Sequence, residues 1–216
     1  MIDNKKERER DELHRTIWNM ANDLRGSVDG WDFKQYVLGM LFYRYISENF
    51  AKYVNAGELE ACNKDFDYAK LDDEVAEEAR EDLVQSKGYF ILPGQLFCNV
   101  KEKAPNNENL NETLESVFRN IESSAQGHDS EDDFKGLFDD IDVNSNKLGS
   151  TVAKRNEKLV KLLNGVANMK LGDYQDNTID AFGDAYEFLM GMYASNAGKS
   201  DGEYYTPQEV SELLFQ

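Results

Sequence analysis

The feature that most constrains the fold of this chain is a helical segment over residues 32–53 that is apolar on almost every side. Asp32 is a good N-cap for this helix because its carboxylate can accept from a first-turn N–H. The residues after it leave little room for a polar face: Val37, Leu38, Met40, Leu41, Phe42 and Tyr45. A helix without a polar face must be surrounded by other elements. We therefore expect it at the centre of a helical domain.

Segments that could surround this helix occur on both sides of it. Apolar residues at helical spacing predict a first helix over residues 6–24, ended by Gly26 as a left-handed cap. The same spacing predicts later helices over residues 72–85, 109–123, 131–138, 151–169 and 179–195.

A different pattern occurs between the helices of the middle region. Residues 89–92 and 95–98 are apolar and are separated by Pro93-Gly94, which predicts a short extended excursion or a hairpin. The sequence as a whole predicts a mainly α fold, a multi-helix bundle with at most a short hairpin.

Composition and charge restrict the partners. The 216 residues fit one large domain or one domain plus part of another, and 40% apolar content suffices for a core. A formal net charge of −18 repels phosphates, so the average surface cannot bind nucleic acid. Acidic residues cluster over 58–82 and 129–142. We interpret these clusters as solvated surface, and a docking surface for a basic partner is the alternative.

Cysteine usage and apolar runs bear on the cellular location. Cys62 and Cys98 lie far apart in the sequence, which suggests neither a disulfide framework nor a zinc knuckle. The densely charged start of the chain has no apolar signal-peptide region, and no apolar run approaches membrane-spanning length. We therefore predict a cytoplasmic protein without a membrane segment.

Two short motifs imitate binding loops but lack required residues. Gly198-Lys199-Ser200 resembles the end of a phosphate-binding loop, but Tyr193 stands where that loop needs its first glycine. Residues 140–144 resemble the start of a calcium loop. Ser145 and Thr151 then occupy the positions that require glycine and glutamate. His14 and His128 share no ligand spacing, so we predict neither a metal site nor a catalytic residue in this chain.

The segment 202–210 has the properties of a helix entrance. Thr206 is a good N-cap, Pro207 fits the first helical position, and Glu209 can complete a capping box. The free N–H groups of such a helix start and its partial positive charge face whatever lies before it. Little helix follows before Gln216. We therefore expect the chain to be the N-terminal part of a longer protein.

Two stretches resemble the modification (methyltransferase) subunit of bacterial type I restriction–modification systems. Residues 24–28 and 36–47, LRGSV and YVLGMLFYRYIS, resemble that subunit's N-terminal helical domain. Residues 185–190 and 202–207, AYEFLM and GEYYTP, resemble the entrance to its methyltransferase domain. The two stretches frame nearly the whole chain in the family's order and spacing.

The resemblance implies a helical N-terminal domain over residues 1–172 and the first helices of a truncated α/β methyltransferase domain over 173–216. The complete protein would transfer a methyl group from S-adenosylmethionine to adenine N6 in a bipartite target in double-stranded DNA. A specificity subunit, a second modification subunit and restriction subunits would be its partners. Cofactor contact carries over to six positions, with Gln208 standing where arginine is common: Glu203, Tyr204, Tyr205, Thr206, Pro207 and Gln208.

The same resemblance implies that the cofactor site of this chain is half built. The family's Gly-rich turn and its Asn-Pro-Pro-aromatic element, which holds the flipped adenine, would lie beyond Gln216. We therefore expect the chain to be inactive alone and to serve DNA clamping and subunit assembly, with Arg25, Lys34 and Arg44 as the candidate DNA contacts. The alternative hypotheses are an acidic DNA mimic and a helical protein-interaction module without an enzymatic role.

Overall fold

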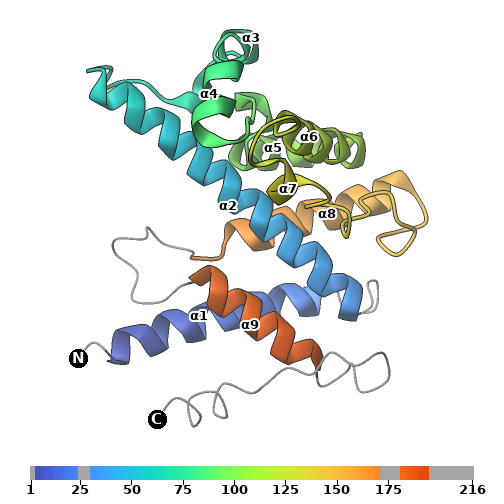
Figure 1. The fold of residues 1–216 in the computed structure, drawn as a ribbon. Helices are drawn as coiled ribbons and strands as arrows, with labels where there is room; N and C mark the ends of the chain where they lie inside the picture. The colour runs from blue at the N-terminus through green and yellow to red at the C-terminus, as the bar shows by residue number, and fades with distance from the viewer. Residues whose placement is uncertain (1–2, 24–29, 171–180, 195–216) are drawn as a thin grey trace. The chain divides into compact units, whose positions relative to one another are not determined.

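The computed structural model describes residues 3–23, 30–170 and 181–194, and every regular element in them is a helix (Figure 1). The described residues belong to two compact units, one formed by residues 1–34 and 168–216 and the other by residues 35–167. The mainly α prediction is confirmed. The α-helices are α1 (Asp3–Asp23), α2 (Gly30–Glu60), α3 (Asp73–Glu77), α4 (Arg80–Lys87), α5 (Phe97–Lys103), α6 (Leu110–Ser124), α7 (Glu131–Phe134), α8 (Val152–Ala167) and α9 (Ala181–Ala194).

Helix α2 is the axis of the 35–167 unit, as its apolar sequence predicts. Its side chains between Val37 and Phe50 are buried on several sides. Tyr43 meets Phe97 of α5 and Phe118 of α6 edge to face, with ring centroids 5.5 Å apart in both pairs. The helix begins at Gly30, so the N-cap predicted at Asp32 is wrong.

The far end of α2 lies well beyond the predicted end near Tyr53. The helix runs to Glu60 and is closed by Cys62, whose φ of 70° places it in the left-handed region. The Cys62 N–H donates to the Leu59 carbonyl at 3.0 Å, and the Asn63 N–H donates to the Glu58 carbonyl at 2.9 Å. These two bonds form a Schellman cap, which usually has glycine where this chain has cysteine.

In the apolar stretch between α4 and α5, backbone carbonyls accept hydrogen bonds from tyrosine hydroxyls instead of from a neighbouring strand. Tyr43 donates to the Gln95 carbonyl at 2.5 Å, and Tyr68 donates to the Ile91 carbonyl at 2.8 Å. Buried carbonyls need a donor, and these long-range bonds supply it without a neighbouring strand. The described residues contain no strand. The hairpin alternative is therefore wrong, because residues 93–95 form a 3₁₀ turn and Phe97 already begins α5.

Two further boundaries differ from the sequence prediction. The helix predicted over 72–85 is two helices, α3 and α4, although Asp72 caps the first one by accepting from the Glu74 N–H at 2.9 Å. Helix α7 covers only Glu131–Phe134 of the predicted 131–138. Helices α6 and α8 confirm their predicted amphipathic patterns, since their periodic apolar residues are buried.

Candidate functional site

Most of the site residues predicted from the sequence lie outside the described residues. This applies to all six cofactor positions from Glu203 to Gln208, to the Thr206 cap, and to Arg25 and Gly26. Of the residues predicted to touch cofactor or DNA, the structure therefore describes Lys34 and Arg44. The described element of the predicted methyltransferase segment is α9.

Helix α9 packs on α1 within one unit. Leu13, Ile17, Ala185 and Leu189 are buried. The His14 imidazole stacks on the Phe188 ring, with centroids 4.0 Å apart and planes inclined by 12°.

An ion pair accompanies this apolar contact. Arg10 donates to Oδ1 of Asp184 through Nε at 3.1 Å, and its Nη2 lies 2.9 Å from the same oxygen. Burial lowers the pKa of His14 below its ordinary 6.5 and outweighs the opposing effect of the Asp184 carboxylate. The first helix of the chain is thereby fixed to the helix that precedes the predicted cofactor segment.

Lys34 lies inside the protein rather than on an open surface. The residue is 6% exposed, and its Nζ donates to the Met190 Sδ of α9 at 3.4 Å. A buried ammonium is poorly placed to reach a phosphate. The observed role of Lys34 is to join the start of α2 to α9, and DNA contact by this residue stays a prediction.

Arg44 is engaged at the carboxyl end of α8. Its Nη1 donates to the Val166 carbonyl at 2.7 Å, and its Nε pairs with Glu48 at 2.6 Å. The last carbonyls of a helix lack partners within the helix, so an arginine placed there stabilises the helix end. The side chain is 13% exposed. Arg44 therefore joins α2 to α8, and its contact with DNA also stays a prediction.

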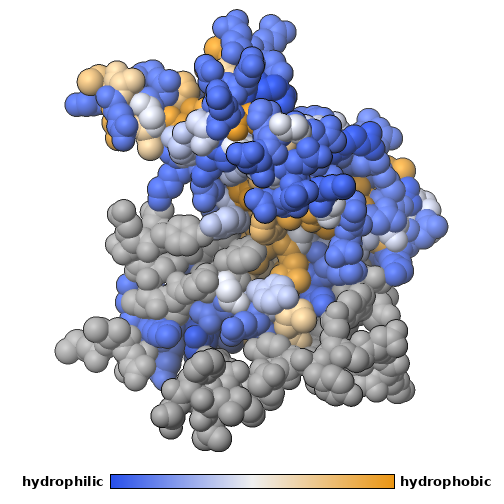
Figure 2. Space-filling model, in the orientation of Figure 1, coloured by the Kyte–Doolittle hydropathy of each residue, from blue (hydrophilic) through white to orange (hydrophobic). Residues whose placement is uncertain are grey.

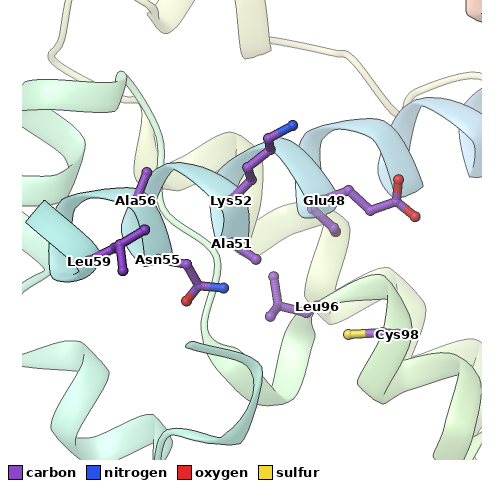
Figure 3. A pocket seen from close by; sticks show the side chains of 9 residues that line it. Glu48, Ala51, Lys52, Asn55, Ala56, Leu59, Leu96 and Cys98 are labelled. Carbon is purple, nitrogen blue, oxygen red and sulfur yellow. The ribbon is translucent and has the colours of Figure 1, made fainter. Parts of the chain in front are cut away.

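A pocket of about 480 Å³ lies on the 35–167 unit (Figure 3). One face of α2 supplies most of its wall, and the stretch before and into α5 supplies Leu96 and Cys98. The sequence prediction missed this pocket, because its lining joins α2 to residues that are distant in the sequence. The α2 residues that line it are Ser47, Glu48, Ala51, Lys52, Asn55, Ala56 and Leu59.

The chemistry of this pocket suits binding rather than reaction. Burial raises the pKa of the Cys98 thiol, and the Asp67 and Glu48 carboxylates oppose its ionisation as well, although Asn99 and its own backbone favour the thiolate. The thiol therefore stays protonated near neutral pH and is a weak nucleophile. Asn55 accepts from the Tyr68 N–H at 2.8 Å through Oδ1.

The residues that resemble a calcium loop form an exposed hydrogen-bonded turn that is tied to the buried Asn111. The Asp142 carboxylate accepts from the Asn144 N–H at 2.9 Å, and Asn144 Oδ1 accepts from the buried Asn111 amide at 2.6 Å. Nowhere in the described part of the chain do three His, Cys, Asp or Glu side chains gather closely enough to hold a metal ion. None of the described helices combines the length and apolar character needed to cross a membrane.

Comparison with known proteins gives two consecutive family matches. Residues 13–166 match the family described as the HsdM N-terminal domain, and residues 177–216 match the family described as N-6 DNA methylase.

Individual relatives agree with these family matches. The chain is 49% identical, over 99% of its length, to the methylase subunit of the type I restriction enzyme MpnII from Mycoplasma pneumoniae, and it covers 40% of that protein. It is 23% identical, over 94% of its length, to the type I restriction enzyme MjaIX methylase subunit from Methanocaldococcus jannaschii, and it covers 34% of it.

A solved structure is similar as well. The crystal structure of the type I restriction–modification system methyltransferase subunit from Streptococcus thermophilus aligns with a TM-score of 0.73 at 32% identity. The alignment covers 94% of this chain and 43% of that one. The chain thus spans less than half the length of each of these relatives.

Proposed function

Because this chain belongs to the family of HsdM N-terminal domains, we propose that it is the helical part, with the start of the catalytic part, of a type I DNA methylase subunit. The complete subunit would transfer a methyl group to adenine N6 in double-stranded DNA. The observation that carries this proposal is the order of the two family matches, helical domain first and N-6 methylase second, along one chain.

S-adenosylmethionine is the proposed methyl donor, and it supplies an activated methyl group. We keep Glu203 to Gln208 as the proposed contacts of this cofactor. We also keep the proposed domain boundary near residue 172. The described residues contribute indirectly, because Arg10 and His14 fix α9, which precedes that segment.

The proposed role of the helical part is assembly and closure over DNA. Its partners would be the specificity subunit, a second modification subunit and the restriction subunit of a cytoplasmic complex. Lys34 and Arg44 are engaged inside the protein, so Arg25 is the first of the three basic candidates to test for DNA contact.

Methyl transfer and cofactor binding test the proposal together. The complete subunit, assembled with its specificity subunit, should transfer tritiated methyl groups to adenine in DNA. The chain of residues 1–216 should transfer none. Calorimetry should detect S-adenosylmethionine binding by the complete subunit only. Absence of methyl transfer by a folded, cofactor-bound assembly would contradict the proposed activity. Methyl transfer by residues 1–216 would contradict the proposal that this part of the subunit is inactive alone.

A further inference from the structure

The pocket on the 35–167 unit is lined by none of the residues proposed for cofactor or DNA contact. We call it the α2 groove, and we define it by the seven α2 residues given above together with Leu96 and Cys98. Apolar side chains form much of its surface, which suits neither phosphates nor a charged cofactor. A ligand that presents apolar side chains suits this surface better.

The shape of the α2 groove follows the axis of α2. Its lining runs from Ser47 to Leu59, a length of about 18 Å at the helical rise of 1.5 Å per residue. That length corresponds to roughly three turns of a second helix laid alongside. Ala51 and Ala56 are small enough to let another backbone approach closely.

Apolar surface is left exposed at one end of this groove. Leu59 is 57% exposed, and Ala56 beside it is also exposed. Figure 2 shows apolar surface at this end of α2, next to strongly hydrophilic surface. A partner that contributes apolar side chains would bury Leu59.

Polar groups at the groove restrict the chemistry of that partner. Glu48 and Lys52 lie on α2 within the groove, and Glu48 already pairs with Arg44. The acidic stretch 58–82 begins at the exposed end of the groove. In Figure 3 the Asn55 amide nitrogen is directed toward Leu96, where it can donate to a ligand carbonyl.

We propose that the α2 groove binds an amphipathic helix carried by another subunit of the assembly. The apolar side chains of that helix, spaced three and four residues apart, would pack against Leu59, Ala56 and Ala51. Lysine or arginine residues at one end of that helix would face the acidic stretch 58–82. A second copy of this chain is a poor occupant, because a chain with a net charge of −18 would be repelled by the acidic stretch 58–82. This inference rests on the proposed function only for the existence of the assembly.

The native Cys98 thiol is a reporter inside the groove. In the complete subunit with Cys62→Ser, the rate of Cys98 alkylation by N-ethylmaleimide is measured by peptide mass spectrometry, alone and in the assembly. We expect assembly to slow this reaction about tenfold or more, because a buried thiol is inaccessible to the reagent. The control is Val152→Cys at the start of α8, a residue that does not line the groove and is 41% exposed in the native chain. Its alkylation rate should not change.

A substitution at the exposed end tests the partner itself. Leu59→Arg should weaken assembly by about tenfold or more and restore Cys98 alkylation, because a charged side chain would replace an exposed apolar contact. Val152→Arg, a matched change at an exposed apolar residue, should leave both unchanged. The affinity of the subunit for its partner should also fall with added salt, because the acidic stretch 58–82 would face basic residues of the partner.

The outcomes separate this inference from the proposed function. An assembly that methylates DNA while Cys98 stays reactive overturns the groove inference alone. Protection of Cys98 already in the isolated subunit also overturns it, since a segment of the same chain or a second copy would then be the occupant. Protection in an assembly that cannot methylate supports the groove and contradicts the proposed activity.

Discussion

At the scale of single residues, the contact between Gly39 and Ile141 explains one feature of the sequence motif in α2. A Cβ atom at Gly39 would lie 1.8 Å from Ile141 Cδ1 and 2.5 Å from its Cγ1, while the Ile141 Cβ is 3.9 Å away. Ile141 is itself buried. The missing side chain of Gly39 therefore lets the loop before α8 pack directly on the central helix.

Gly39→Ala should destabilise the protein by about 1–3 kcal/mol, because the added methyl group overpacks this contact. The control is Gly57→Ala in the same helix, where a Cβ meets nothing within 4 Å. There the better helix propensity of alanine should stabilise by about 0.5–1 kcal/mol. Urea unfolding measures both changes. In the double variant with Ile141→Ala, the cost of Gly39→Ala should largely disappear. Equal effects at Gly39 and Gly57 would contradict this account.

Cys62 gives a second prediction at the residue scale. A residue with a side chain in the left-handed region costs about 1–2 kcal/mol, and Cys62 has a φ of 70°. Cys62→Gly should therefore raise the free energy of unfolding by about 1 kcal/mol, and Cys62→Val should lower it, since β-branched residues tolerate this conformation poorly. Urea unfolding of the two variants should give changes of opposite sign. A loss of stability in Cys62→Gly would show that the cysteine side chain is needed for packing.

At the scale of elements, the sequence predicted correctly the helices whose apolar residues mark the buried face. The periodic residues of α6 and α8 and the apolar run of α2 are buried as predicted. The errors occur where a residue that is distant in the sequence determines the local backbone structure. Tyr43 and Tyr68 bond the carbonyls that a hairpin would have paired, and no local pattern encodes those contacts. The end of α2 was missed because a cysteine occupies the usual glycine position of the cap.

The pairing of α1 with α9 should depend on pH through His14. Its pKa in the folded state lies below the ordinary 6.5, chiefly because the imidazole is buried. The unfolded state therefore binds the proton more readily. The contribution of His14 to stability is present above 6.5 and is lost as the pH falls through that value toward the folded pKa. His14→Phe keeps a ring against Phe188 but cannot titrate.

The prediction is a difference between the native chain and His14→Phe. Unfolding free energies at about pH 7.5 and about pH 5.5 should fall more in the native chain, since only its ring gains a proton. The remaining pH dependence, common to both proteins, comes from other groups. If the two proteins lose the same stability, His14 does not couple protonation to folding.

At the scale of the whole molecule, the family was predicted from sequence motifs. The stretches around Tyr36–Ser47 and Ala185–Met190 identified the methylase subunit family, and the family matches confirm that identification. An acidic DNA mimic is not favoured by these matches. The α2 groove could not be predicted, because its lining joins residues 47–59 to Leu96 and Cys98 through tertiary packing. The predicted cofactor positions lie outside the described residues and stay predictions.

The division into two units leads to a prediction about autonomous folding. Within residues 35–167, Phe50 of α2 packs edge to face on Tyr68 and Phe90 with centroids 5.5 Å and 5.8 Å away. Arg44 supplies the α8 end with its donor from the same unit. A fragment of residues 30–167 keeps α2 and α8 whole, together with these aromatic contacts and the donor at the α8 end. We expect it to fold alone.

Circular dichroism and urea unfolding test this expectation. The fragment should show a helical spectrum and a single cooperative transition, because its core does not depend on α1 or α9. Phe50→Ala is the control for the assay and should lower the free energy of unfolding by about 3–5 kcal/mol, the usual cost of emptying such a site. A gradual transition with exposed apolar surface would mean that the 35–167 unit needs α1 and α9 to fold. In that case Lys34 and the first turn of α2, which belong to the other unit, would be part of the folding core.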